Sequence, residues 1–330
     1  HLNSVHETDE LRASYVKCVP KEAEFSSSIL LNTNLWKVIK RAAEKSDHEN
    51  LSDEQRRFIQ LTVEEFMDNG ADLPEDKKQR VSAINVELSK LCKNFQDNVK
   101  DSTNKGELYV TNESDLKGLP SSAIEAAKED ATSKGHPDQW RFNLQYPSRL
   151  PIIKYLDNDE IRHKMYELGL TIGRGGDYDN TENIKKITAL RDEKAQILGY
   201  KTFADFATAR RMAQNGWNAL KFVENLHNKV YKQFIEDIET LKKYVHSKDP
   251  KIELKPWNFS YWSEKQRKEQ YDFDEEELKP YFSTQKVLDG LFKIVQKIYN
   301  IEVRQRETFV PSEDDKNDHE GQVEVWQKDV

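Results

Sequence analysis

Histidine residues are the first candidates for chemistry in this chain, because imidazole is the commonest metal ligand in proteins. The sequence of 330 residues contains eight of them. A helical zinc site needs two histidines four residues apart with a glutamate beside the first, the pattern H-E-x-x-H. His6-Glu7 and His48-Glu49 come closest, but neither has a second histidine in range. His163 and Glu167 would share a helix face, where a surface ion pair is favoured over a pair of metal ligands. We therefore assign no metal-binding residue here.

Nucleophiles and phosphate-binding loops give no complete site either. Cys18 lies just before Pro20, and Cys92 lies beside the apolar stripe of an amphipathic helix, where a free thiol usually acts as a small apolar residue. The sequence has no G-x-S-x-G elbow for a serine nucleophile. Gly169–Gly176 is rich in glycine and contains Arg174, but no Gly-Lys-Ser/Thr follows it, which favours a loop between two helices. We assign no catalytic and no cofactor-binding residue.

A dense run of aromatic residues between Pro256 and Trp262 is the remaining candidate. Packing between helices is one interpretation of this run. The other is that Trp257, Tyr261 and Trp262 line a cleft, where rigid rings would hold an extended peptide. The residues alone leave both interpretations open.

Composition and charge exclude several classes of protein. The formal net charge is -8, from 51 Lys and Arg against 59 Asp and Glu, and no concentrated basic face suggests nucleic-acid binding. No run approaches the roughly 20 apolar residues that span a bilayer, and no signal-peptide pattern is present. With two cysteines a disulfide framework is improbable, which fits a reducing cytosol. We expect a folded cytoplasmic protein with neither a nucleic-acid nor a membrane partner.

Helices must supply most of the scaffold, because only 12 residues are glycine and apolar residues recur at steps of three and four. The helix with the clearest periodicity begins near Pro74 and carries Val81 and Ile84 inward. Ser52 and Gln55 form a capping box that predicts another helix start. Further helices are predicted over 7–19, 23–45, 52–69, 122–133, 159–170, 181–198, 223–245 and 288–299, the first ending at Pro20.

Two intervals carry the alternation of apolar and polar residues that is typical of strands. In 106–147, Leu108 and Val110 alternate with polar neighbours, and so do Trp140, Phe142, Leu144 and Tyr146, which predicts a small β hairpin with a short helix between its strands. Val323 and Val325 predict a last strand that has no visible partner. The fold class is therefore mainly α. We expect two regions, 1–148 and 149–330, divided where the β-rich interval ends.

Many short motifs stand in the order and at the spacings of one protein family. They are His1-Leu2-Asn3-Ser4-Val5 with Glu10-Leu11-Arg12, Leu119-Pro120, Leu150-Pro151, Leu190-Arg191, Leu198-Gly199-Tyr200, Pro256-Trp257 to Tyr261 with Ser263-Glu264-Lys265-Gln266, and Pro280-Tyr281-Phe282 with Gly290-Leu291-Phe292. On these motifs the chain resembles the amino-terminal half of a zinc metallopeptidase of the oligopeptidase A and thimet oligopeptidase family, and oligopeptidase A most of all. The resemblance covers essentially the whole chain.

This resemblance implies a helical, clam-shell architecture in which a deep channel between two lobes admits short peptides. It implies hydrolysis by zinc-activated water, with H-E-x-x-H and a more distant glutamate lying beyond position 330. We therefore expect a fragment whose two ends are both cut, whose partners are short peptides and the missing C-terminal catalytic region, and which alone is inactive. The zinc ligands would lie outside this chain. The alternative is a non-catalytic helical binding or scaffold protein that is related to the peptidases.

Overall fold

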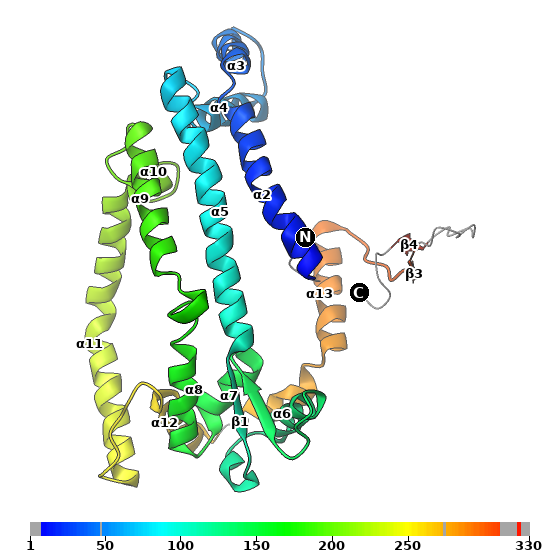
Figure 1. Cartoon of the computed structure of the whole chain (residues 1–330), viewed down its shortest axis with the longest axis vertical. Coiled ribbons are helices and arrows are strands. Elements are labelled where there is room, and N and C mark those ends of the chain that lie inside the picture. The colour runs from blue at the N-terminus through cyan, green and yellow to red at the C-terminus, as the bar shows by residue number, and fades with distance from the viewer. Residues whose placement is uncertain (1–7, 47, 273–274, 311–321, 325–330) are drawn as a thin grey trace. The chain divides into compact units, whose positions relative to one another are not determined.

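The computed structural model describes residues 8–46, 48–272, 275–310 and 322–324 (Figure 1). Twelve α-helices account for most of these residues, which confirms the prediction of a mainly α fold. The helices are α2 (Asp9–Leu30), α3 (Thr33–Ser46), α4 (Asp53–Asp68), α5 (Glu75–Lys105), α6 (Ser121–Ser133), α7 (Tyr146–Tyr155), α8 (Asp159–Gly169), α9 (Thr181–Ile197), α10 (Phe203–Thr208), α11 (Gly216–Lys248), α12 (Phe259–Tyr271) and α13 (Thr284–Tyr299). Short 3₁₀ helices are η1 (Glu113–Leu116), η2 (Gly176–Tyr178) and η3 (Glu275–Tyr281), and the strands are β1 (Glu107–Val110), β2 (Trp140–Asn143), β3 (Thr308–Phe309) and β4 (Val323–Glu324).

The chain forms two compact units, residues 1–266 and residues 267–330, and the boundary between them falls within α12. All residues of the candidate site described below belong to the first unit. The division expected near Arg149 and the clam-shell arrangement stay predictions.

Helix α5 is the axis of the first unit, with α2 and α9 packed along it (Figure 1). Val81 and Ile84, predicted to point inward, are fully buried. Polar contacts fix the packing of α9: the buried Asn180, just before α9, donates from Nδ2 to the carbonyl of Phe95 at 3.1 Å and accepts from Nδ2 of Asn98 at 3.0 Å. Because buried amide groups need hydrogen-bond partners, these two bonds fix the position of α9 along α5.

Pro20 does not end the first helix, so the prediction of a helix end there is wrong. Helix α2 continues through Pro20 to Leu30, and α3 begins at Thr33. A proline leaves the carbonyl four residues earlier without its helical bond. Here that residue is Val16, which is about half exposed, so water can satisfy its carbonyl. Contacts with α5 on both sides of Pro20 keep the helix in one path, Arg12 to Asp101 at 2.7 Å and Asn85 to Ser27 at 3.0 Å.

The capping box at the start of α4 is confirmed. The backbone N–H of Gln55 donates to Oγ of Ser52, and the backbone N–H of Ser52 donates to the side chain of Gln55. The helix ends at Asp68 with Asn69 as its C-cap, close to the predicted position. On its inner face Phe66 stacks on Trp36 of α3, with ring centroids 5.9 Å apart.

The two strands predicted in 106–147 pair in antiparallel fashion, with Leu108 opposite Phe142 and Val110 opposite Trp140. They are not a hairpin in the strict sense, because α6 lies between them in the sequence. The predicted alternation also fails at Tyr146, which is 73% exposed and begins α7. A core of nine buried side chains joins this sheet to α6, α7 and α8: Val110, Leu116, Leu119, Ala127, Phe142, Leu144, Ile152, Leu156 and Met165.

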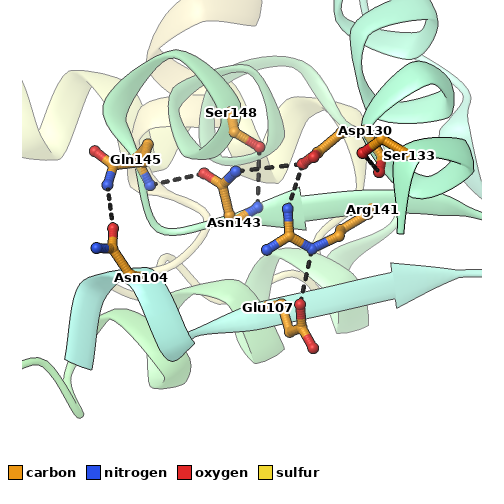
Figure 2. Close-up of polar contacts among 8 residues, drawn as sticks. All are labelled: Asn104, Glu107, Asp130, Ser133, Arg141, Asn143, Gln145 and Ser148. Atoms are coloured by element: carbon orange, nitrogen blue, oxygen red, sulfur yellow. Dashed lines mark hydrogen bonds and ion pairs between the residues drawn. The ribbon is translucent and has the colours of Figure 1, made fainter. Parts of the chain in front are cut away.

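Arg141 of β2 connects the sheet to α6, as Figure 2 shows. Its guanidinium lies 8% exposed and donates to Glu107 of β1 at 2.7 Å and to Asp130 of α6. Burial alone would lower the pKa of Arg141, but the two carboxylates outweigh burial and raise it. From the same strand, the backbone N–H of Asn143 donates to Oγ of Ser148 in α7 at 3.0 Å (Figure 2).

The last predicted strand has a partner, so the expectation of an unpaired strand is wrong for the part that the structure describes. Strand β4 runs parallel to β3, with Val323 opposite Thr308. The backbone N–H of Val323 donates to the carbonyl of Glu307 at 2.9 Å. Val325 and the residues after it lie outside the described residues.

Candidate functional site

A hollow of about 600 Å³ opens in the first unit between the start of α8 and the segment that leads into α12. Its walls include all three aromatic residues singled out in the sequence, Trp257, Tyr261 and Trp262. Asp157 and Arg162 face them across about 100 residues of sequence. We call this feature the aromatic hollow.

The segment before α12 is shaped by one buried side chain. Asn258, 3% exposed, accepts at Oδ1 from the backbone N–H of Lys255 at 2.8 Å and donates from Nδ2 to the carbonyl of Glu253 at 3.0 Å. An asparagine that bonds backbone groups a few residues away holds a tight turn without regular secondary structure. This turn sets the position of Trp257, and the following helix carries Tyr261 and Trp262 one turn further on.

Asp157 is the polar centre of the hollow. It accepts a hydrogen bond from the hydroxyl of Tyr261 at 2.8 Å and another from Nζ of Lys265 at 3.1 Å. Burial alone would raise the pKa of Asp157, but these two bonds and the lysine charge outweigh burial and lower it. Asp157 is therefore ionised at neutral pH.

Tyr261 is buried and serves as a donor. Burial, followed by the bond to Asp157 and the charge of that carboxylate, raises the pKa of Tyr261 to about 12. A phenol with such a pKa stays protonated at neutral pH, so it holds Asp157 in place and does not act as a general base.

Arg162 lies beneath the Tyr261 ring, with its guanidinium carbon 3.9 Å from the ring centroid. The side chain is 2% exposed, donates to the carbonyl of Leu156 and forms an ion pair with Asp159. Its Nε is a buried polar atom with no hydrogen-bond partner among the described residues. A buried, paired and stacked guanidinium is held rigidly, so it supports the ring that forms the floor of the hollow.

The two tryptophans are half-buried and keep part of their rings at the surface. Trp257 donates from Nε1 to Asp159 at 3.0 Å, and its ring stacks on His163 with centroids 4.0 Å apart. Trp262 packs edge-on against Tyr261 at 5.2 Å. Both rings are thus fixed by their neighbours at the wall of the hollow.

All three aromatic residues border the hollow, Tyr261 buried and Trp257 and Trp262 half-buried. That they line a peptide channel stays a prediction. The contact predicted between His163 and Glu167 is present, with 3.3 Å between Nε2 and Oε1. Sequence reasoning missed Asp157 and Arg162 as parts of the site. No local signal marks them, because their partners lie about 100 residues away.

Groups of three or more His, Cys, Asp or Glu side chains placed to hold a metal ion do not occur within the described ranges. The two cysteines, Cys18 and Cys92, are free, the first exposed and the second half-buried. The walls of the aromatic hollow carry hydrogen-bond donors, charged groups and aromatic rings.

Comparison with known proteins assigns the chain to a family. Residues 152–330 match the family model described as Peptidase family M3. The chain belongs to this family. Residues 1–78 match the Neurolysin/Thimet oligopeptidase, N-terminal domain. The aromatic hollow lies within the M3 match, and the resemblance inferred from the motifs is confirmed.

Three curated relatives match the whole chain. Oligopeptidase A of Haemophilus influenzae is 34% identical to the chain, which covers 47% of that relative. Probable cytosolic oligopeptidase A of Arabidopsis thaliana is 33% identical, and 46% of it is covered. Organellar oligopeptidase A, chloroplastic/mitochondrial, of Arabidopsis thaliana is 31% identical, and 41% of it is covered. The chain spans about half the length of these relatives. None of the helices that the structure describes combines the length and apolarity needed to cross a membrane.

Proposed function

We propose that this chain serves the hydrolysis of short peptides, as the scaffold and substrate-channel part of a zinc-dependent oligopeptidase. In this proposal the aromatic hollow holds part of the peptide. The observation that carries it is the position of Trp257 and Trp262, which keep ring surface at a hollow inside the region matched by the M3 family.

The chemistry of the hollow suits a peptide. Partly exposed indole rings offer flat apolar surface for side chains at a low entropy cost. Lys251, Glu253 and Lys255 lie at the wall, where Glu253 and Lys255 form an ion pair with each other and Lys251 adds a positive charge that can attract a peptide carboxylate. A volume of about 600 Å³ is in the usual range for pockets that bind drug-sized ligands, so a few residues of an extended chain fit and a folded domain does not.

Zinc, which the family resemblance implies, is not accommodated by the described side chains, so no catalytic step is derived for this chain. Zinc in such enzymes polarises the scissile carbonyl and lowers the pKa of a bound water. We place the zinc ligands and the general base in the half of the relatives that this chain does not span. The 330-residue chain alone is therefore proposed to be inactive.

The proposed partners are short peptides and a polypeptide corresponding to that other half. A cytosolic location is part of the proposal, and the printed name of one Arabidopsis relative supports it. Another relative is named as organellar, so fractionation of the source cells is the direct measurement.

Binding of a fluorescein-labelled nonapeptide that contains Leu and Phe tests the role of the hollow. Trp257→Ala and Trp262→Ala should each weaken binding by roughly 3- to 10-fold, because one aromatic contact contributes about 0.5–1.5 kcal/mol. Trp217→Ala is the matched control, since Trp217 is 59% exposed and lies on α11 away from the hollow. Equal affinities for all four proteins would refute the proposal.

Turnover of a fluorogenic peptide with added zinc separates binding from catalysis. We expect no chelator-sensitive hydrolysis by the 330-residue chain, and hydrolysis by a protein of the relatives' full length. Hydrolysis by the chain alone would contradict its proposed inactivity. Peptide binding without hydrolysis by the longer protein would favour the alternative, a non-catalytic binding protein.

A further inference from the structure

Helix α11 carries a long apolar stripe that other residues of the first unit cover only at one end. The stripe consists of Leu220, Val223, Leu226, Val230 and Phe234, and it continues through Leu241 and Val245 at the same helical spacing. We call the first five the α11 stripe. Leu241 and Val245 are 3% and 0% exposed, whereas the five side chains of the α11 stripe are 48–60% exposed.

Both ends of α11 are anchored. At the start, the backbone N–H of Gly216 donates to Asp205 of α10 at 3.0 Å, and a Cβ at Gly216 would lie 2.8 Å from that of Ala204. At the far end, Tyr244 packs against Trp262 with centroids 6.4 Å apart. The helix is therefore held in place, and in Figure 1 it runs along an edge of the first unit.

The exposed apolar area of the α11 stripe is about half of what one partner in a stable interface buries. Its five large side chains are 48–60% exposed. With about 200 Å² for the aromatic side chain and somewhat less for each aliphatic one, they present on the order of 400 Å². One partner in a stable protein–protein interface buries about 800 Å², so the contact would extend to the neighbouring exposed Tyr231 and Ile235. An apolar patch of roughly 400 Å² is as large as the largest patch on a typical monomer, and such patches are often binding sites.

We propose that the α11 stripe is the docking surface for the polypeptide corresponding to the half of the M3 relatives that this chain does not span. The α11 stripe lies inside the M3 match, and the relatives are about twice as long as the chain. A stripe from Leu220 to Phe234 is about 21 Å long, so it takes an apolar face of comparable length. A second copy of the chain is a different occupant, and the crosslinking test below distinguishes it.

This inference rests on the proposed function, because it names the surface through which the two halves meet. Its test does not require hydrolysis. Photoreactive benzoylphenylalanine is placed at Val230 or Phe234 in the protein as expressed in its source cells, and crosslinked peptides are identified by mass spectrometry. Lys232 is the control position, because it lies roughly 200° around the helix from each of the two residues.

We expect crosslinks from Val230 and Phe234 to peptides that align with the unspanned half of the relatives, in at least 5-fold higher yield than from Lys232. Such crosslinked peptides support the inference whether they belong to the same polypeptide or to a separate one. Crosslinks to a second copy, to α13 or to an unrelated protein, or no crosslinks at all, would overturn the inference. A protein that crosslinks as expected but hydrolyses no peptide would refute only the proposed function.

A double variant checks that the surface itself carries the interaction. Val230→Glu with Phe234→Glu should leave the circular dichroism and the Tm of the chain within about 3 °C, because exposed positions contribute little to folding. Crosslinking from Leu226 in the same variant should fall at least 5-fold. Lys232→Glu with Lys243→Glu, two exposed positions roughly 160–180° around the helix from the middle of the stripe, should leave that yield unchanged, and an equal loss in both double variants would contradict the inference.

Discussion

Removal of one hydroxyl, in the variant Tyr261→Phe, measures how firmly the aromatic hollow is held. The side chain is 8% exposed, and its hydroxyl donates to the ionised Asp157 at 2.8 Å. A hydrogen bond to a charged group contributes about 1.5–3 kcal/mol. Asp157 keeps a second donor in Lys265 and is itself 29% exposed, so part of the loss is recovered. We expect the free energy of unfolding at pH 7 to fall by about 1–2 kcal/mol.

The same variant has a pH signature with a defined sign. The pKa of Tyr261 is raised from an ordinary value of 10.0 to about 12 in the folded chain. A raised pKa means that the stabilisation is complete below pH 10 and is lost as the pH rises toward 12. The full shift corresponds to about 2.7 kcal/mol, which solvent screening reduces to roughly half. The difference between wild type and Tyr261→Phe should therefore shrink by about 1 kcal/mol between pH 9 and pH 11.5.

Urea unfolding followed by circular dichroism at pH 7, 9 and 11.5 provides the assay. Comparison with the variant cancels the titration of the other tyrosines and lysines, which both proteins share. Tyr146→Phe is the control, because Tyr146 is 73% exposed and should give almost no difference at any pH. A difference below about 0.3 kcal/mol at pH 7, or one that does not change with pH, would refute the reasoning.

Two further pairs of substitutions test the scaffold of the first unit. Gly118→Ala should destabilise the chain by about 2–4 kcal/mol in urea unfolding, because Gly118 has φ +97° and a Cβ there would lie 2.3 Å from the carbonyl oxygen of Tyr155. Gly175→Ala, at φ +73° with open space around it, should cost only about 1 kcal/mol, and equal costs would show that the clash does not matter. Arg141→Met should lower stability by about 1–3 kcal/mol, since it leaves two acidic partners without their buried cation. Arg80→Met, which breaks an exposed ion pair, should cost distinctly less, and thermal unfolding that ranks the two arginines in reverse would contradict this account.

Local signals were sufficient for most elements of the fold. The helical period of α5, the capping box at Ser52 and the alternation around Phe142 each predicted the element that the structure contains. Local rules failed where a distant contact changed the outcome. Pro20 lies inside a helix because α5 holds α2 on both sides of it. Strand β4 acquired a partner that its own residues do not indicate.

The candidate site could be predicted only in part. The sequence singled out Trp257, Tyr261 and Trp262 because aromatic density is a property of a short segment. It could not show that Tyr261 would be packed and the tryptophans half-exposed. Asp157 and Arg162 were missed altogether, since a carboxylate and a guanidinium near a helix start look like ordinary surface residues until α12 is placed against them.

The sequence by itself determined most of the helices, the small sheet and the family, because periodicity, caps and motif order are encoded among neighbouring residues. Tertiary structure alone decided which faces are covered. The spacing of apolar residues in α11 is the same at Val230 and at Val245, yet one is 49% exposed and the other is fully buried. Burial depends on what lies across the helix, and that is fixed by contacts between residues far apart in the chain.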